Sequence, residues 1–216
     1  MISSKTADWL IPSALIALAA IPILAGTVRL TALVSGGPIS ESNVRFIAAP
    51  LPITLHIVSV ILFSVLGAFQ FAPAFRARRP DWHRAAGRIV AMSGLVAGLS
   101  GIWMALFYAI IPADSTLLQG FRLFFGAAMV ASIVNGFLAI RRRDIVNHQA
   151  WMRRAYAIGL GAGTQAVTQL PFILIFGRPF IGLGLALMMG GAWILNLIIA
   201  EWMIQRQTTP AFQIPL

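Results

Sequence analysis

Six stretches of the sequence are long and apolar enough to cross a membrane as helices, which takes about 20 residues each. They run over residues 10–28, 51–75, 89–113, 123–140, 155–177 and 179–200. Lipid offers the backbone no hydrogen-bond partners, so only helices or a closed barrel can span it, and uninterrupted apolar runs select helices. The sequence therefore predicts an all-α bundle of six transmembrane helices, forming a single integral membrane domain over residues 1–216. With only 10% charged residues, it excludes a water-soluble enzyme.

The positions of the arginines predict the orientation of this bundle. Five lie between the second and third runs and five between the fourth and fifth: Arg76, Arg78, Arg79, Arg84, Arg88, Arg141, Arg142, Arg143, Arg153 and Arg154. Lys5 precedes the first run and Arg206 follows the last. Short loops rich in Lys and Arg stay in the cytoplasm. Both termini are therefore predicted to be cytoplasmic, with loops 34–50, 112–121 and 177–179 outside.

The formal net charge of +10 has the same origin. Basic residues in short loops suit the lipid bilayer and its anionic headgroups. We expect no nucleic-acid partner, because no separate domain presents these residues. The chain has no cysteine, which removes thiolate metal sites. No metal site, phosphate-binding loop or catalytic motif is expected, and no catalytic residue is assigned.

The first run raises the question of processing. Lys5, an apolar stretch and the small residues Ala17 and Ala19 weakly resemble a cleaved signal peptide. The uncharged run continues to Val28, which is long for such a peptide, so an uncleaved membrane anchor is favoured.

The sequence also contains an internal echo. A shift of 65 residues superimposes six pairs: Gln70 on Asn135, Arg78 on Arg143, His83 on His148, Arg88 on Arg153, Gly94 on Gly159 and Gly98 on Gly163. The echo indicates either a duplicated hairpin or separate selection for Arg in two loops. Small residues four apart recur at Gly94–Gly98, Gly159–Gly163 and Ala186–Gly190. Such faces let helices approach closely, either within one bundle or in a homodimer.

Polar residues inside the runs form two predicted clusters, which are functional candidates because such residues are costly in lipid. The outer cluster comprises Arg29, His56, Arg122, Gln165 and Gln169. It is suited to an anion, a lipid phosphate or a quinone carbonyl. Alternatively, the two arginines extend to headgroups and His56 bonds to a neighbouring helix.

The inner cluster gathers around two histidines near helix starts. Its members are His83, His148, Gln70, Arg88, Asn135, Trp151, Arg153, Asn196 and Glu201. Asp81 is a predicted N-cap before His83, and Asp144 or Asn147 is one before His148. Glu201 is expected to pair with Arg88, Arg153 or Arg154. One interpretation is an interfacial belt of salt bridges and aromatic anchors.

Two further interpretations give the clusters a function. His83 and His148 are candidate axial ligands of one haem b, with Gly87 leaving room for the macrocycle. Alternatively, a transport path joins the two clusters along the fifth run, where Pro171 either breaks the helix, as in transporters, or makes a tolerated kink.

Two strings carry a resemblance to known proteins: His-Arg-Ala-Ala-Gly-Arg at 83–88 and Arg-Arg-Arg-Asp-Ile-Val-Asn-His-Gln-Ala-Trp-Met-Arg-Arg at 141–154. With His56, they make roughly residues 10–205 similar to the uncharacterised bacterial membrane proteins grouped as domain of unknown function 2306. This resemblance implies a multi-span membrane protein and no particular reaction. We expect the bundle to lie in the bacterial cytoplasmic (inner) membrane. Its family-like positions are His56, His83, Arg88, His148, Trp151 and Arg153. A looser similarity to cytochrome b561-type bundles depends only on transmembrane histidines.

Three hypotheses for function follow. The first is a small-molecule or ion carrier, or a regulatory membrane protein, working through the polar clusters. The second is a single-haem or quinone-linked electron-transfer protein that uses His83 and His148. The third is a structural or lipid-interacting subunit.

Overall fold

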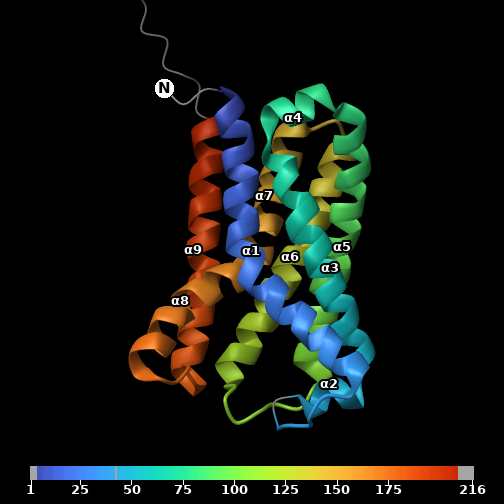
Figure 1. The fold of residues 1–216 in the computed structure, drawn as a ribbon. Coiled ribbons are helices and arrows are strands. Elements are labelled where there is room, and N and C mark those ends of the chain that lie inside the picture. The colour runs from blue at the N-terminus through green and yellow to red at the C-terminus, as the bar shows by residue number, and fades with distance from the viewer. Residues whose placement is uncertain (1–3, 42, 209–216) are drawn as a thin grey trace, which may run out of the picture.

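The fold is a bundle of long helices, seen in a computed structural model that describes residues 4–41 and 43–208 (Figure 1). Its helices are α1 (Ser4–Ser35), α2 (Val44–Ala48), α3 (Pro50–Ala68), the 3-10 turn η1 (Phe69–Phe71), α4 (Pro73–Arg78), α5 (Pro80–Phe107), α6 (Thr116–Arg141), α7 (Ile145–Gly159), α8 (Gly161–Phe176) and α9 (Gly182–Thr208). The described residues contain no strand. The predicted all-α class is confirmed.

Six helical segments are long and apolar enough to cross a membrane, as the sequence predicts. The third lies at Pro80–Phe107, earlier than the predicted 89–113, because Tyr108 is extended and ends α5. The fifth begins at Ile145 rather than at 155, since its polar first turns are also helical. The second ends at Phe71, where Ala72 is extended and α4 begins.

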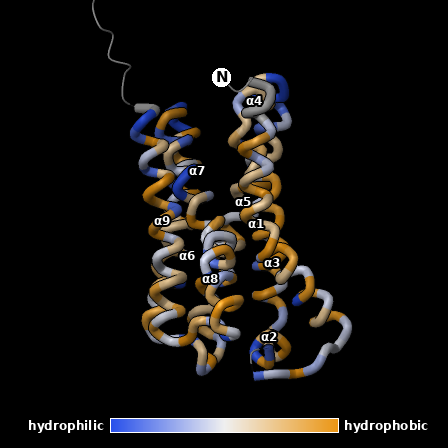
Figure 2. The backbone as a smooth tube through the Cα atoms, turned by 60° about the vertical axis from the view of Figure 1, so that its left-hand side comes forward, coloured by the Kyte–Doolittle hydropathy of each residue, from blue (hydrophilic) through white to orange (hydrophobic). Residues whose placement is uncertain are grey.

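The helices run between two ends of the bundle. The start of α1, α4, the turn between α6 and α7, and the close of α9 lie at one end (Figure 1). We call it the inner end, after the predicted orientation. The outer end carries α2 and the segments 108–115 and 177–181. Hydrophilic residues gather at both ends of the bundle, and mostly hydrophobic residues make up the spans between them (Figure 2).

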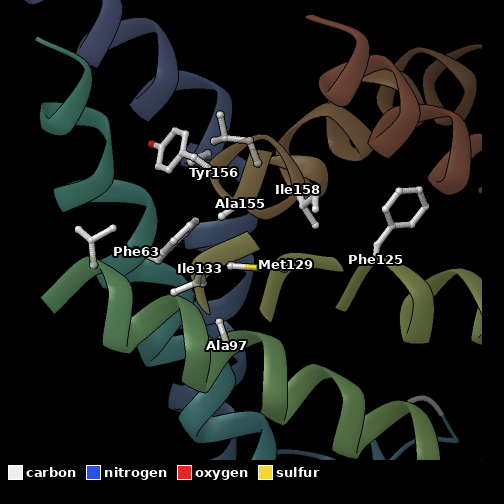
Figure 3. Packing of buried hydrophobic residues seen from close by; sticks show 11 residues of the cluster. Phe63, Ala97, Phe125, Met129, Ile133, Ala155, Tyr156 and Ile158 are labelled. Atoms are coloured by element: carbon white, nitrogen blue, oxygen red, sulfur yellow. The ribbon is translucent and has the colours of Figure 1, made fainter. Parts of the chain in front are cut away.

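The core centres on Phe63 of α3, which is 2% exposed. Its ring packs at 5.4 Å from that of Tyr156, whose hydroxyl donates to the Ser64 carbonyl at 2.7 Å. Ile133 and Met129 of α6 complete this contact (Figure 3). The core therefore ties α3 to α6 and α7.

The small-residue faces predicted from the sequence are covered by the chain's own side chains. A Cβ on Gly94 or on Gly159 would meet the Phe63 ring. One on Gly98 would meet Val130, and one on Gly163 the backbone oxygen of Leu18. These faces therefore support close packing inside the bundle.

The fifth span is interrupted in its middle, between α7 and α8 at Leu160. A continuous helix would pair the Ala157 carbonyl with the N–H of Gly161. Instead, Asn196 of α9 donates to that carbonyl at 3.1 Å and accepts from the Thr164 hydroxyl at 2.8 Å. Pro171, the residue at which the sequence allowed a break, lies inside α8.

Candidate functional site

The two candidate histidines lie in the first turns of α5 and α7, at the inner end. Asp144 caps α7 by accepting from the Asn147 N–H at 3.1 Å. The Asp81 cap predicted for α5 is wrong, because Pro80 takes the first helical position. Asp81 therefore lies in the first turn, where it pairs with Arg84.

His148 is held by a helix facing its own. Its Nδ1 lies 2.8 Å from the carbonyl oxygen of Gly136 on α6. A carbonyl only accepts, so Nδ1 carries a proton, and Nε2 is the ring nitrogen that this hydrogen bond leaves unused. Hydrogen bonding of one ring nitrogen to a backbone carbonyl is how proteins orient histidines that bind metals. The bond to Gly136 therefore fixes the orientation of the His148 ring.

His83 and Gln70 bring unpaired polar atoms to the same end. The His83 Nδ1 and the Gln70 Nε2 are buried and have no hydrogen-bond partner in the described structure. Gly87 follows His83 by one turn, and a Cβ there would meet only the Gln70 Oε1, at 3.5 Å. Buried polar atoms are rarely left unpaired, so the His83 Nδ1 and the Gln70 Nε2 each keep the capacity for one further hydrogen bond.

The charge around these residues is positive. His83 lies within electrostatic range of Arg76, Arg84 and His148. Arg153 lies within electrostatic range of Arg76. No ion pair joins Arg76 or Arg153 to an acid in the described part of the chain. The inner site thus combines two imidazoles with two arginines that form no ion pair among the described residues.

The other predicted members of the inner cluster serve different contacts. Glu201 pairs with Arg154, the third of its predicted partners, through two hydrogen bonds, one at 2.9 Å. Arg154 also stacks on Trp151 at 4.6 Å. Arg88 is exposed and Asn135 is half-buried.

Asn196 departs from the predicted inner cluster altogether, since it braces the break in the fifth span.

The predicted outer cluster is divided among separate contacts. The His56 Nδ1 lies 2.9 Å from the Ala97 carbonyl oxygen and 3.2 Å from the Ser100 hydroxyl, both on α5. Gln165 donates to the Met189 carbonyl on α9 at 3.2 Å, and Gln169 is half-buried. His56 and Gln165 therefore join helices, as the alternative interpretation of His56 expected.

The arginines at the outer end include a residue that the sequence interpretation did not select. Arg122 binds Asp114 in two hydrogen bonds, at 2.7 and 3.1 Å. Arg45 of α2 lies 3.5 Å from the same carboxylate. Arg29 and Arg45 both lie over the Phe46 ring. The hydropathy profile places Arg45 in a loop between two apolar runs. The adjacent Phe46 was the one sequence feature that indicated a contact of Arg45 with an aromatic ring.

The length and apolar composition of six helical segments define a helical membrane protein with six spans. The chain belongs to the family described as predicted membrane protein DUF2306, whose model matches residues 53–204. No curated protein and no solved structure matches it. The family has no assigned reaction, and the match covers the residues of the inner site.

Proposed function

We propose that the protein is a membrane haem protein that holds one haem b between His83 of α5 and His148 of α7. The proposal rests on the hydrogen bonding of the two imidazole rings. His148 has its Nδ1 bound to Gly136, leaving Nε2 free as a ligand, and His83 has a buried nitrogen without a partner. Two imidazoles at one end of a bundle match the ligand set of a bis-histidine haem, whose iron would exchange single electrons.

The charges of the site support the same ligand. A haem carries two propionates, and Arg76 and Arg153 are two cations without acidic partners in the described structure. Arginine is the residue best suited to bind carboxylates in pairs of hydrogen bonds. Gly87 leaves the face of α5 beside His83 open except for Gln70.

The test is an absorption spectrum of protein purified from haem-supplied cells, with and without dithionite. We expect a Soret band that shifts on reduction and is lost in both His83→Ala and His148→Ala. His56→Ala is the matched control, because this third histidine bonds to α5 instead and should leave the band unchanged. Wild-type protein without a Soret band would contradict the proposal. So would a band that survives both replacements together.

A carrier function is the second candidate, favoured by the break in the fifth span. Broken helices near the middle of the membrane form the substrate sites of many transporters. Here the polar groups at the break bond to one another, through Thr164, Asn196 and the Ala157 carbonyl. We place the carrier second for that reason. It becomes the leading hypothesis if the purified protein shows no haem spectrum.

A further inference from the structure

Three arginines and one aspartate lie close together at the outer end of the bundle. Arg45 and Arg122 share the carboxylate of Asp114, whose side chain is 3% exposed, and Arg29 lies over the same aromatic ring as Arg45. Arg122 makes both short bonds to that carboxylate, and Arg45 approaches it only to 3.5 Å. Asp114 therefore neutralises Arg122 first, and two guanidinium groups remain in excess.

Phe46 brings these two excess cations together. The guanidinium carbons of Arg29 and Arg45 lie 4.5 and 4.9 Å from the centre of its ring. Tyr108 packs against the same ring edge-on, at 5.4 Å, and donates to the Ala49 carbonyl at 2.6 Å. Burial raises the pKa of the Tyr108 phenol, which keeps it a neutral donor. The aromatic group thus fixes two like charges near each other at an apolar boundary.

Arg45 also lacks an acceptor for one of its donors. Its Nη1 donates to the Ala109 carbonyl at 3.0 Å, but its Nε is buried and has no partner in the described structure. A buried donor on a charged group that stays unpaired costs more than a neutral one. A negatively charged oxygen beside Nε would provide the acceptor and reduce the repulsion between Arg29 and Arg45.

We propose that Arg29 and Arg45 form a binding site for a phosphate group at the outer end. Paired guanidinium groups match the geometry of phosphate oxygens. Arg45 is 14% exposed and supplies the buried contact, whereas Arg29 is exposed and leaves the site open on one side. The phosphate is either free in solution or part of a lipid headgroup. This site is separate from the proposed haem and does not depend on it.

The first arm of the test uses inorganic phosphate and the full chain in an uncharged detergent. We expect a saturable rise in the thermal midpoint over chloride at equal ionic strength. Arg45→Gln and Arg29→Gln should each weaken it about tenfold, the loss of one charge-assisted hydrogen bond. Arg178→Gln is the matched control, since Arg178 is an exposed arginine at the same end. Arg29 is exposed, so its variant remains informative if Arg45→Gln fails to fold.

The second arm uses nanodiscs of phosphatidylcholine with or without phosphatidylglycerol, followed by mass spectrometry of the lipid retained after transfer to detergent. Retention of phosphatidylglycerol by wild type and by Arg178→Gln, with loss in Arg29→Gln, would identify a lipid headgroup as the source. A response to inorganic phosphate alone would identify a free ion. The proposal is overturned if neither probe binds, or if both bind the arginine variants as well as wild type.

Discussion

Asp81 and Asp144 occupy similar places in the sequence, each shortly before a histidine at the start of a helix. Only Asp144 is a cap: it accepts from the Asn147 N–H at 3.1 Å and from its side-chain amide at 2.6 Å. Pro80 is favoured at the first helical position because it has no N–H to satisfy. It therefore moves Asp81 inside α5. Pro80 is therefore the sequence feature that distinguishes the role of Asp81 from that of Asp144.

Asp144 gives a pH-dependent prediction. Its hydrogen bonds to Asn147 lower the pKa of the carboxyl below its ordinary value of 3.8. A lowered folded-state pKa stabilises the fold above the ordinary pKa, and this contribution is lost as the pH falls through the lowered value. Asp144→Ala should lower the thermal midpoint in detergent at neutral pH, with a smaller difference from wild type below pH 3.8.

Asp144→Asn is the control for the cap itself, because asparagine also accepts from the helix N–H groups but does not titrate. This variant should keep most of the midpoint at neutral pH and lack the pH dependence of wild type. A constant difference between Asp144→Ala and wild type across the acidic range would contradict the role of the charge.

The residues of the candidate site were only partly predictable. The positions of His83 and His148 followed from the apolar runs and the arginines, because both signals are local in sequence. The bond from His148 to Gly136 did not, since it depends on how α7 packs against α6. Arg45 was missed for the same reason: its partners Asp114 and Ala109 are distant in sequence.

At the scale of elements, hydropathy predicted six spans but not where one of them breaks. The hydropathy of an apolar run does not indicate which helix packs against it. The break at Leu160 accompanies close contacts of two glycines: a Cβ on Gly161 would meet the Trp193 ring, and one on Gly163 the Leu18 backbone. Pro171 offered a stronger local signal, yet α8 continues through it. Tertiary contact has therefore decided the break.

Gly163 gives the prediction at this scale. An added methyl group would meet the backbone oxygen of Leu18, which cannot move aside as a flexible side chain can. Gly163→Ala should therefore push α8 away from α1. We expect it to reduce the free energy of unfolding by roughly 1–3 kcal/mol, the usual range for overpacking. Denaturation of the purified protein in mixed micelles measures this change.

Gly191→Ala is the matched control. Gly191 lies inside α9, and a Cβ there has nothing within 4 Å. Alanine also favours a helix over glycine. The free energy of unfolding of this variant should therefore equal that of wild type or exceed it by up to about 1 kcal/mol. Equal losses in the two variants would contradict the role of the contact with α1, because a Cβ on Gly191 has no neighbour to displace.

At the scale of the whole molecule, residues paired by the 65-residue shift occupy corresponding positions in the structure. Gly94 and Gly159, which that shift pairs, both pack against the ring of Phe63. His83 and His148, paired by the same shift, both lie in first turns at the inner end. Matched residues thus take matched positions around the core. The arrangement concentrates both arginine-rich turns, both termini of the described chain and the proposed haem site at one end (Figure 1).

The side of the membrane that this end faces is the last prediction. The turns carrying Arg76, Arg78, Arg79, Arg141, Arg142 and Arg143 lie at the inner end. By the preference of short basic loops for the cytoplasm, that end should face inward. Alkaline phosphatase, active only outside the inner membrane, should be inactive when fused after Arg79 or Arg143 and active after Gly37 or Arg178. The reverse pattern would place the proposed haem outside and the proposed phosphate site inside. A mixed pattern would contradict the six-span arrangement itself, because Gly37 and Arg178 lie at one end of the bundle and Arg79 and Arg143 at the other.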